Sequence, residues 1–96
     1  MEFESVDTHY EVNRELVLST SHLPEAMANR LESKNPRMFL PYYVYEYGYR
    51  IYNTGEWQDY PVELQEHIQK ATELRCKWVV YDCDGPTYEE FEKYEW

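Results

Sequence analysis

Apolar residues recur at helical spacing in two segments of the chain. In the segment from Pro61 to Arg75 they are four, three and three residues apart, which places on one helical face Leu64, Ile68, Ala71 and Leu74. In the earlier segment the residues that share one face are Leu23, Ala26, Met27 and Leu31. We expect this first helix to run from about Ser21 to Ser33, since Pro36 disfavours helical geometry in the residue before it. Hydroxyls at residues 19–21 are expected to cap it.

Short runs rich in Val, Ile, Leu and Tyr predict four strands. The first lies at residues 16–18 and the last at residues 78–81. The β-rich stretch from residue 38 to residue 53 is expected to divide into two strands near Gly48. The order strand, helix, strand, strand, helix, strand is typical of the ferredoxin-like fold. We therefore expect an α+β fold, ferredoxin-like βαββαβ, with one four-stranded antiparallel sheet and both helices on one face.

A chain of 96 residues has room for one domain. We divide this domain, residues 1–96, into an acidic N-terminal segment (1–15), a βαββαβ body (16–81) and an acidic C-terminal tail (82–96). The tail is polar with four aromatic insertions, namely Tyr88, Phe91, Tyr94 and Trp96. Burying aromatic rings is favourable enough that we expect this tail to pack against the body.

Negative charge is concentrated at the two ends of the sequence. Nineteen Asp and Glu against nine Lys and Arg give a formal charge of −10, and residues 1–15 and 82–96 carry nine of these ten charges. The acids of the second stretch are Asp82, Asp84, Glu89, Glu90, Glu92 and Glu95. Direct binding to nucleic acid is disfavoured, because such binding depends on Lys and Arg neutralising phosphates. Two interpretations remain open: the charge serves solubility, or the ends form one negative patch that competes for a partner's basic groove.

Tyrosines are concentrated in the predicted second strand and the turn after it. Because side chains alternate across a sheet, Tyr43, Tyr45 and Tyr47 are expected on one face. Such residues can pack across neighbouring strands, or, where exposed, form a protein contact surface. With Tyr88 of the tail and the acids above, they are the residues that we predict to bind a partner.

The sequence offers no convincing catalytic set. Residues 79–87 look like the strand-end Asp-x-Asp-Gly of haloacid-dehalogenase phosphatases, but only nine residues follow Thr87, too few for the lysine and magnesium-binding acids of that fold. The spacing from Asp82 to Lys93 does not match a calcium-binding EF-hand loop. Cys83 lies between two carboxylates, which raise a thiol pKa rather than activate the thiol. We expect neither an enzyme nor a cofactor, and the histidines and cysteines match no zinc-ligand spacing.

The cysteines and the N-terminus indicate a reducing compartment. If the residues between Cys76 and Cys83 are extended, the two lie about 23 Å apart at ~3.3 Å per residue, too far for a disulfide. We expect two free thiols. The N-terminal seven residues contain acids where a signal peptide has basic residues, and the chain lacks a run of roughly 20 apolar residues. These features predict a cytoplasmic protein without membrane contact.

Several short motifs resemble a known but uncharacterised family. They are residues 17–23 (Val-Leu-Ser-Thr-Ser-His-Leu) with Glu25, Tyr47-Gly48 before a strand, Cys76-Lys77-Trp78-Val79 with Asp82-x-Asp84-Gly85-Pro86, and the ending Tyr94-Glu95-Trp96. Together they resemble a family of small acidic proteins of unknown function encoded by phages and mobile elements, in which an apolar or aromatic residue often stands where this chain has Arg50. The resemblance implies a bacterial host cytosol and a product that blocks host defence, and it transfers no catalytic residue.

Two functions follow as hypotheses. In the first, the chain is a non-catalytic inhibitor of the anti-CRISPR type that mimics nucleic acid and binds a host protein with a basic nucleic-acid-binding surface, such as a CRISPR effector or a restriction enzyme. In the second, it is a phage accessory or adaptor domain that forms a homodimer through its tyrosine-rich sheet, and its acidity serves only solubility.

Overall fold

The computed structural model of the chain describes residues 10–33 and 41–96. The elements, in chain order, are strand β1 (Glu15–Ser19), 3-10 helix η1 (Thr20–His22), helix α1 (Glu25–Glu32), strands β2 (Tyr42–Tyr45) and β3 (Gly48–Tyr52), 3-10 helix η2 (Trp57–Asp59), helix α2 (Val62–Glu73) and strand β4 (Trp78–Asp82). The predicted order of strands and α-helices is confirmed, although residues 38–40 of the predicted second strand lie outside the described residues. Within residues 10–33 and 41–96, no helix has both the length and the apolar character needed to cross a bilayer.

The sheet is mixed, so the expected ferredoxin-like antiparallel arrangement is wrong. Its strand order is β1-β4-β3-β2. β1 runs parallel to β4, with Glu15 opposite Trp78 and Ser19 opposite Asp82. The pairs β3–β4 and β2–β3 are antiparallel. The chain is therefore an α+β protein with a four-stranded mixed sheet and two α-helices.

The direction of β4 follows from the path of the chain between β3 and β4. Tyr52 at the end of β3 lies opposite Trp78 at the start of β4. The Asn53 N–H donates to the Lys77 carbonyl at 2.7 Å, and the Asn53 side chain donates to the Cys76 carbonyl at 3.0 Å. The segment that contains α2 thus leaves and rejoins the sheet at the same end, which makes β3 and β4 antiparallel neighbours. Hydrophobic periodicity predicts the type of an element but does not determine this direction.

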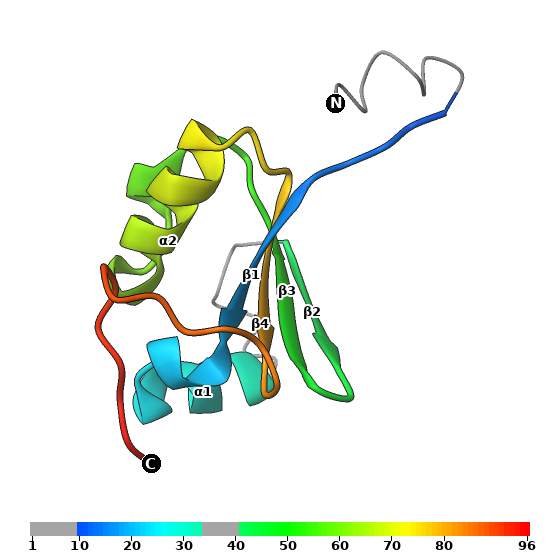
Figure 1. Cartoon of the computed structure of the whole chain (residues 1–96). Helices are drawn as coiled ribbons and strands as arrows, with labels where there is room; N and C mark the ends of the chain where they lie inside the picture. Colours follow the sequence, from blue (N-terminus) through cyan, green and yellow to red (C-terminus); the bar gives the residue numbers. More distant parts are fainter. Residues whose placement is uncertain (1–9, 34–40) are drawn as a thin grey trace.

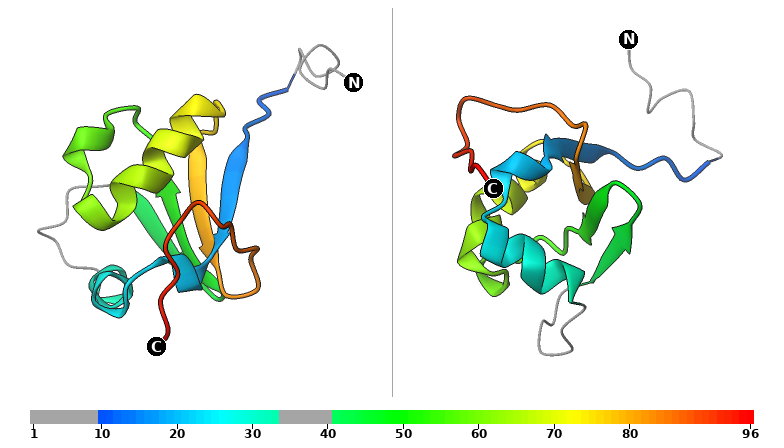
Figure 2. Two further views of the ribbon diagram at one scale, coloured as in Figure 1. Left: turned by 60° about the vertical axis from the view of Figure 1, so that its left-hand side comes forward. Right: turned by 90° about the horizontal axis from the view of Figure 1, so that it is seen from below.

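Both α-helices cover one face of the sheet, as Figure 1 and the two views of Figure 2 show. Alternate strand residues pack beneath them, and Leu18, Ile51, Val79 and Tyr81 are completely buried there. From the helices, the fully buried apolar side chains include Met27, Leu31, Leu64 and Ile68. The other alternate residues form what we call the open face of the sheet: Glu15, Val17, Tyr43, Tyr45, Arg50, Tyr52, Trp78, Val80 and Asp82.

Gly48 permits the close approach of β3 to β4 directly after the turn from β2. A β-carbon at this position would lie 1.8 Å from the Tyr81 carbonyl oxygen and 3.3 Å from the Asp82 α-carbon. Both atoms belong to the backbone of β4 and cannot move without disturbing the sheet. The glycine that the sequence marks as the boundary between two strands is therefore required by packing between β3 and β4.

Replacing Gly48 with alanine should lower the free energy of unfolding by about 1–3 kcal/mol, the usual cost of overpacking. Gly55→Ala is the matched control, because Gly55 has a positive φ of 89° but no atom within 4 Å of the position that a β-carbon would occupy. Urea unfolding of both variants separates the steric clash from backbone strain. Equal losses of stability in the two variants would contradict the close contact at Gly48.

The helix boundaries differ slightly from those predicted. The Ser19 hydroxyl accepts a hydrogen bond from the Ser21 N–H at 3.1 Å, so it caps η1. α1 starts only after Pro24, which provides no side-chain cap, and the expected capping of this helix is wrong. α2 ends at Glu73 because Arg75 has a φ of 61°, the left-handed conformation that terminates helices.

The residues after β4 (83–96), called the tail below, pack against the body as the sequence predicts. The Ser19 N–H donates to the Pro86 carbonyl at 2.7 Å, and the Tyr88 hydroxyl donates to the Val17 carbonyl at 2.9 Å. Both contacts are made at the free edge of β1. From there the tail passes to the helical side of the sheet, where the C-terminus lies near α1 (Figures 1 and 2). The tail therefore covers part of a strand edge that would otherwise be open to pairing with another chain.

Candidate functional site

Two buried histidines lie where the tail meets the helical layer. His22 in η1 is 1% exposed and His67 in α2 is 3% exposed. Their ring centroids are 6.1 Å apart. The Phe91 ring lies with its centroid 4.8 Å from that of His67 and 5.8 Å from that of His22. The buried Phe91 ring of the tail therefore packs against both histidines.

His22 fixes the tail through both ring nitrogens. Its Nδ1 lies 2.9 Å from the Glu92 carbonyl oxygen, and its Nε2 accepts from the Tyr88 N–H at 3.0 Å. A carbonyl can only accept and a backbone N–H can only donate, so the neutral ring with its proton on Nδ1 satisfies both bonds. The Tyr88 ring also stacks on His22 at a centroid distance of 6.2 Å.

His67 lies against Tyr81 of β4. Its Nδ1 and the Tyr81 hydroxyl share a hydrogen bond of 2.7 Å. Burial, with a further contribution from His22, lowers the pKa of His67 to about 4. Burial also raises the pKa of Tyr81 well above its ordinary value. Both groups are therefore neutral near pH 7. Their shared hydrogen bond gives each of these buried polar side chains a partner inside the core.

Sequence reasoning did not identify this histidine pair. His67 lies three residues after Leu64 and one before Ile68, so its position on the apolar face of α2 was visible in the pattern. His22 carried no such signal, because its role depends on the path of the tail. The two histidines are packing residues that hold the tail in place.

The predicted acids of the tail project into solvent while the tail backbone is held. Glu89, Glu90, Glu92 and Glu95 are all exposed. The Tyr94 N–H donates to the Ser21 carbonyl at 2.7 Å, and the Trp96 indole N–H donates to the Leu23 carbonyl at 2.8 Å. Anchored residues thus alternate with exposed acids along the last nine residues of the chain.

Helix α2 adds two acids to those of the tail. Burial and then the carboxylate of Glu92, with smaller contributions from Glu63 and Glu66, raise the pKa of Tyr94. These three acids therefore lie around one phenol. We define the acidic tail surface as Glu63, Glu66, Glu89, Glu90, Glu92 and Glu95. Lys70 of α2 pairs with Glu90 at 3.3 Å. The two α2 acids were missed from the sequence, because only the fold places them beside the tail.

The predicted tyrosines separate into different environments. Tyr43 is 63% exposed on the open face, with its ring centroid 5.9 Å from that of Trp78. The Tyr45 hydroxyl donates to Asp82 Oδ2 at 2.7 Å on the same face. Tyr47, in the turn between β2 and β3, is 50% exposed, and its ring centroid lies 6.3 Å from that of Tyr45. Tyr88 is half-buried in the tail, where it serves as an anchor.

The predicted binding residues therefore occupy two surfaces. Tyr43, Tyr45 and Asp82 belong to the open face, and the tail glutamates lie beside α2 on the helical side. Glu15, an acid of the N-terminal segment, pairs with Arg50 on the open face at 3.6 Å. The described acids of the N-terminal segment thus include one that lies on the opposite face from the tail acids, so they do not all form one patch.

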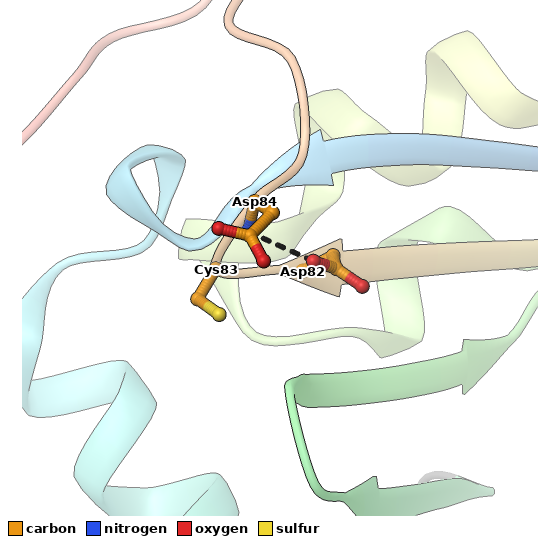
Figure 3. A group of neighbouring side chains, drawn as sticks. All are labelled: Asp82, Cys83 and Asp84. Atoms are coloured by element: carbon orange, nitrogen blue, oxygen red, sulfur yellow. Dashed lines mark hydrogen bonds between the residues drawn. The ribbon is translucent and has the colours of Figure 1, made fainter.

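Asp82, Cys83 and Asp84 form the tightest cluster of potential metal ligands in the described part of the chain (Figure 3), with one ligand atom of each within 4.8 Å of the others. Asp82 Oδ1 accepts from the Asp84 N–H at 2.8 Å, and Asp82 Oδ2 accepts from Tyr45. Both oxygens of this carboxylate thus have protein donors. The cluster is explained as a turn stabilised by Asp82. Cys83 is exposed, Cys76 is buried, and both thiols are free, as predicted.

Comparison with known proteins identifies the family. The model of a family described as "Family of unknown function (DUF5983) C-terminal domain" matches residues 15–96. The chain belongs to the DUF5983 family. No curated protein and no solved structure matches this chain.

The DUF5983 match includes all four strands of the sheet as well as the tail. It begins at Glu15, the first residue of β1, and ends at Trp96. The acidic tail surface and the open face therefore both lie within the DUF5983 domain. The expected membership of an uncharacterised family is confirmed.

Proposed function

We propose that this DUF5983 domain is a non-catalytic inhibitor that uses its acidic tail surface to occupy the basic nucleic-acid-binding groove of another protein. The observation that carries the proposal is the combination of a hydrogen-bonded tail backbone with exposed glutamates. His22 holds the tail at Tyr88 and Glu92, while Glu89 and Glu92 remain accessible. Carboxylates in fixed positions can replace phosphates at lower entropic cost than carboxylates on a flexible segment.

The net charge of −10 supports the same partner class. A strongly negative protein is steered toward a Lys- and Arg-rich surface, and the attraction weakens as salt screens the charges. Contact with nucleic acid itself is disfavoured by the same charge. The choice of a CRISPR effector or restriction enzyme of a bacterial host, and of the cytosol as the location, rests on the resemblance to phage and mobile-element proteins.

The second candidate function is an accessory domain that forms a homodimer through the sheet. It is favoured by the exposure of Tyr43 beside Trp78 on the open face. Two chains of charge −10 repel each other, however, so we rank this function below binding to a basic protein. Sedimentation at increasing protein concentration distinguishes the two, because only the homodimer requires self-association.

Replacing Glu89, Glu90 and Glu92 together with glutamine should weaken inhibition more than tenfold. The assay measures DNA binding by purified CRISPR effector complexes and restriction enzymes with the full chain as competitor. The melting temperature should stay nearly unchanged, because exposed charges, and the solvent-accessible pair of Glu90 with the partly exposed Lys70, contribute little to stability.

The control triple variant has Glu25, Glu46 and Glu56 replaced with glutamine. These three acids are exposed and outside the acidic tail surface, so the change in net charge is the same. Inhibition by the control should remain within a few-fold of that by the unmodified chain. Equal loss in both variants would show that only total charge matters, and absence of inhibition across the panel would reject the proposal.

A further inference from the structure

The open face of the sheet contains a charged hollow that the acidic tail surface does not use. Its volume is about 330 Å³, and its walls are Glu15, Val17, Tyr45, Arg50, Val80 and Asp82. This volume lies at the lower end of the range for ligand pockets, roughly 300–1,000 Å³. The helices and the tail pack on the opposite side of the sheet (Figures 1 and 2).

The hollow has more negative than positive charge. Two carboxylates, Glu15 and Asp82, line it together with one guanidinium, that of Arg50. The pKa of Tyr45 is raised mainly by burial and further by the two carboxylates, first Asp82 and then Glu15. Both carboxylates therefore lie close enough to influence the same phenol. A cation that entered the hollow would meet oxygens from both acids against the apolar walls of Val17 and Val80.

Arg50 shows how this face holds a guanidinium. Its guanidinium carbon lies 4.4 Å from the Trp78 ring centroid, and its Nη2 lies 3.6 Å from Glu15. Stacking on an aromatic face combined with pairing to a carboxylate is the usual environment for arginine at protein contacts. The aromatic rings of Tyr43 and Tyr52 lie beside Trp78, with centroids at 5.9 and 5.2 Å.

Arg50 is nevertheless held weakly. Its side chain is 43% exposed and its contact with Glu15 is long, so the pair contributes little energy. Its Nε is buried and has no hydrogen-bond partner among the described residues, which is an unfavourable state for a charged group. Displacing this side chain from Trp78 and Glu15 would therefore cost little.

We infer that the open face is a second contact surface, whose hollow takes the arginine or lysine side chain of a basic protein segment. The inference rests on the proposed function, in which the partner is a basic protein. The incoming cation pairs with Glu15 and Asp82 and displaces the Arg50 guanidinium from the Trp78 ring. A second copy of this chain is a poorer occupant than a basic segment, because each copy has a charge of −10.

The test uses a penta-arginine peptide, acetylated and amidated at its ends, titrated into the isotope-labelled full chain and followed by NMR. We expect shifts of the Trp78 indole and the Arg50 and Val80 amides in addition to those of the tail. Glu15→Gln with Asp82→Asn should weaken binding at the open face about tenfold. The control, Glu25→Gln with Glu46→Gln, removes the same amount of negative charge outside the hollow. It should change the affinity of the open face for the peptide less than twofold.

Arg50→Gln is expected to change the affinity for the peptide in the opposite direction. Because Arg50 competes with the peptide for Glu15 and Trp78, its removal should tighten binding several-fold. Weaker binding would show that Arg50 supports the open face instead of competing with the peptide, and this would overturn the inference. Shifts confined to the tail would also overturn it but leave the proposed function intact, whereas absence of shifts at both surfaces would reject both. Shifts of the open face that grow with protein concentration alone would assign it to a second copy.

Discussion

Replacing Phe91 with alanine is expected to lower the free energy of unfolding by about 3–5 kcal/mol, the range for removing a buried aromatic ring. Phe91 is 5% exposed and packs against His22, His67 and Tyr88. Alanine would leave a cavity beside two buried histidines and free the adjacent tail backbone to move. Because the tail glutamates depend on that backbone for their positions, inhibition of a partner should fall together with stability.

Trp96→Ala is the control for Phe91→Ala, since it removes a second aromatic ring from the same tail. Trp96 is 55% exposed and has one hydrogen bond, from its indole to the Leu23 carbonyl. We expect a loss of about 1 kcal/mol, the typical net value of one hydrogen bond. Urea unfolding measures both variants. If Phe91→Ala cost no more than Trp96→Ala, the tail would be a loosely attached segment.

Mild acid is expected to destabilise the protein through His67. Its pKa is about 4 in the folded chain, against 6.5 for an unperturbed histidine. The unfolded chain therefore binds a proton that the folded chain does not bind. Stability is fully present above about pH 6.5 and is lost as the pH falls toward 4, by about 3 kcal/mol in total. Chemical denaturation at a series of pH values between 4 and 7.5 measures this loss.

The double variant His67→Leu with Tyr81→Phe isolates this contribution. It removes both partners of the buried hydrogen bond, so no polar group is left unpaired in the core. Its stability should depend less on pH between 6.5 and 4 than that of the unmodified chain. An unchanged pH dependence would assign the acid sensitivity to groups other than His67.

Element types were readable from the sequence because they depend on local patterns. The spacing of Leu64, Ile68 and Ala71 predicts α2, and Gly48 marks the boundary between β2 and β3. The sheet topology was not readable, since the parallel pairing of β1 with β4 depends on where the chain leaves and rejoins the sheet. The bond from Asn53 to Lys77, which closes the connection that contains α2, has no counterpart in hydrophobic periodicity.

The candidate surfaces were predicted in part. Residue types identified the tail glutamates and the tyrosines of β2 as candidates for contact. The pairing of Arg50 with Glu15 and Trp78 joins three strands, so it could not be inferred without the strand order. The same holds for Glu63 and Glu66, which join the tail glutamates only because the tail returns to α2.

The parallel pairing of β1 with β4 has a consequence for folding kinetics. Glu15 pairs with Trp78, so the edge strand near the start of the chain must find a partner more than sixty residues away. The hairpin of β2 and β3, by contrast, closes through a two-residue turn at Glu46 and Tyr47. Folding rates fall as the sequence separation of contacts rises. We therefore expect the hairpin to form first and the docking of β1 onto β4 to be the slower step of folding.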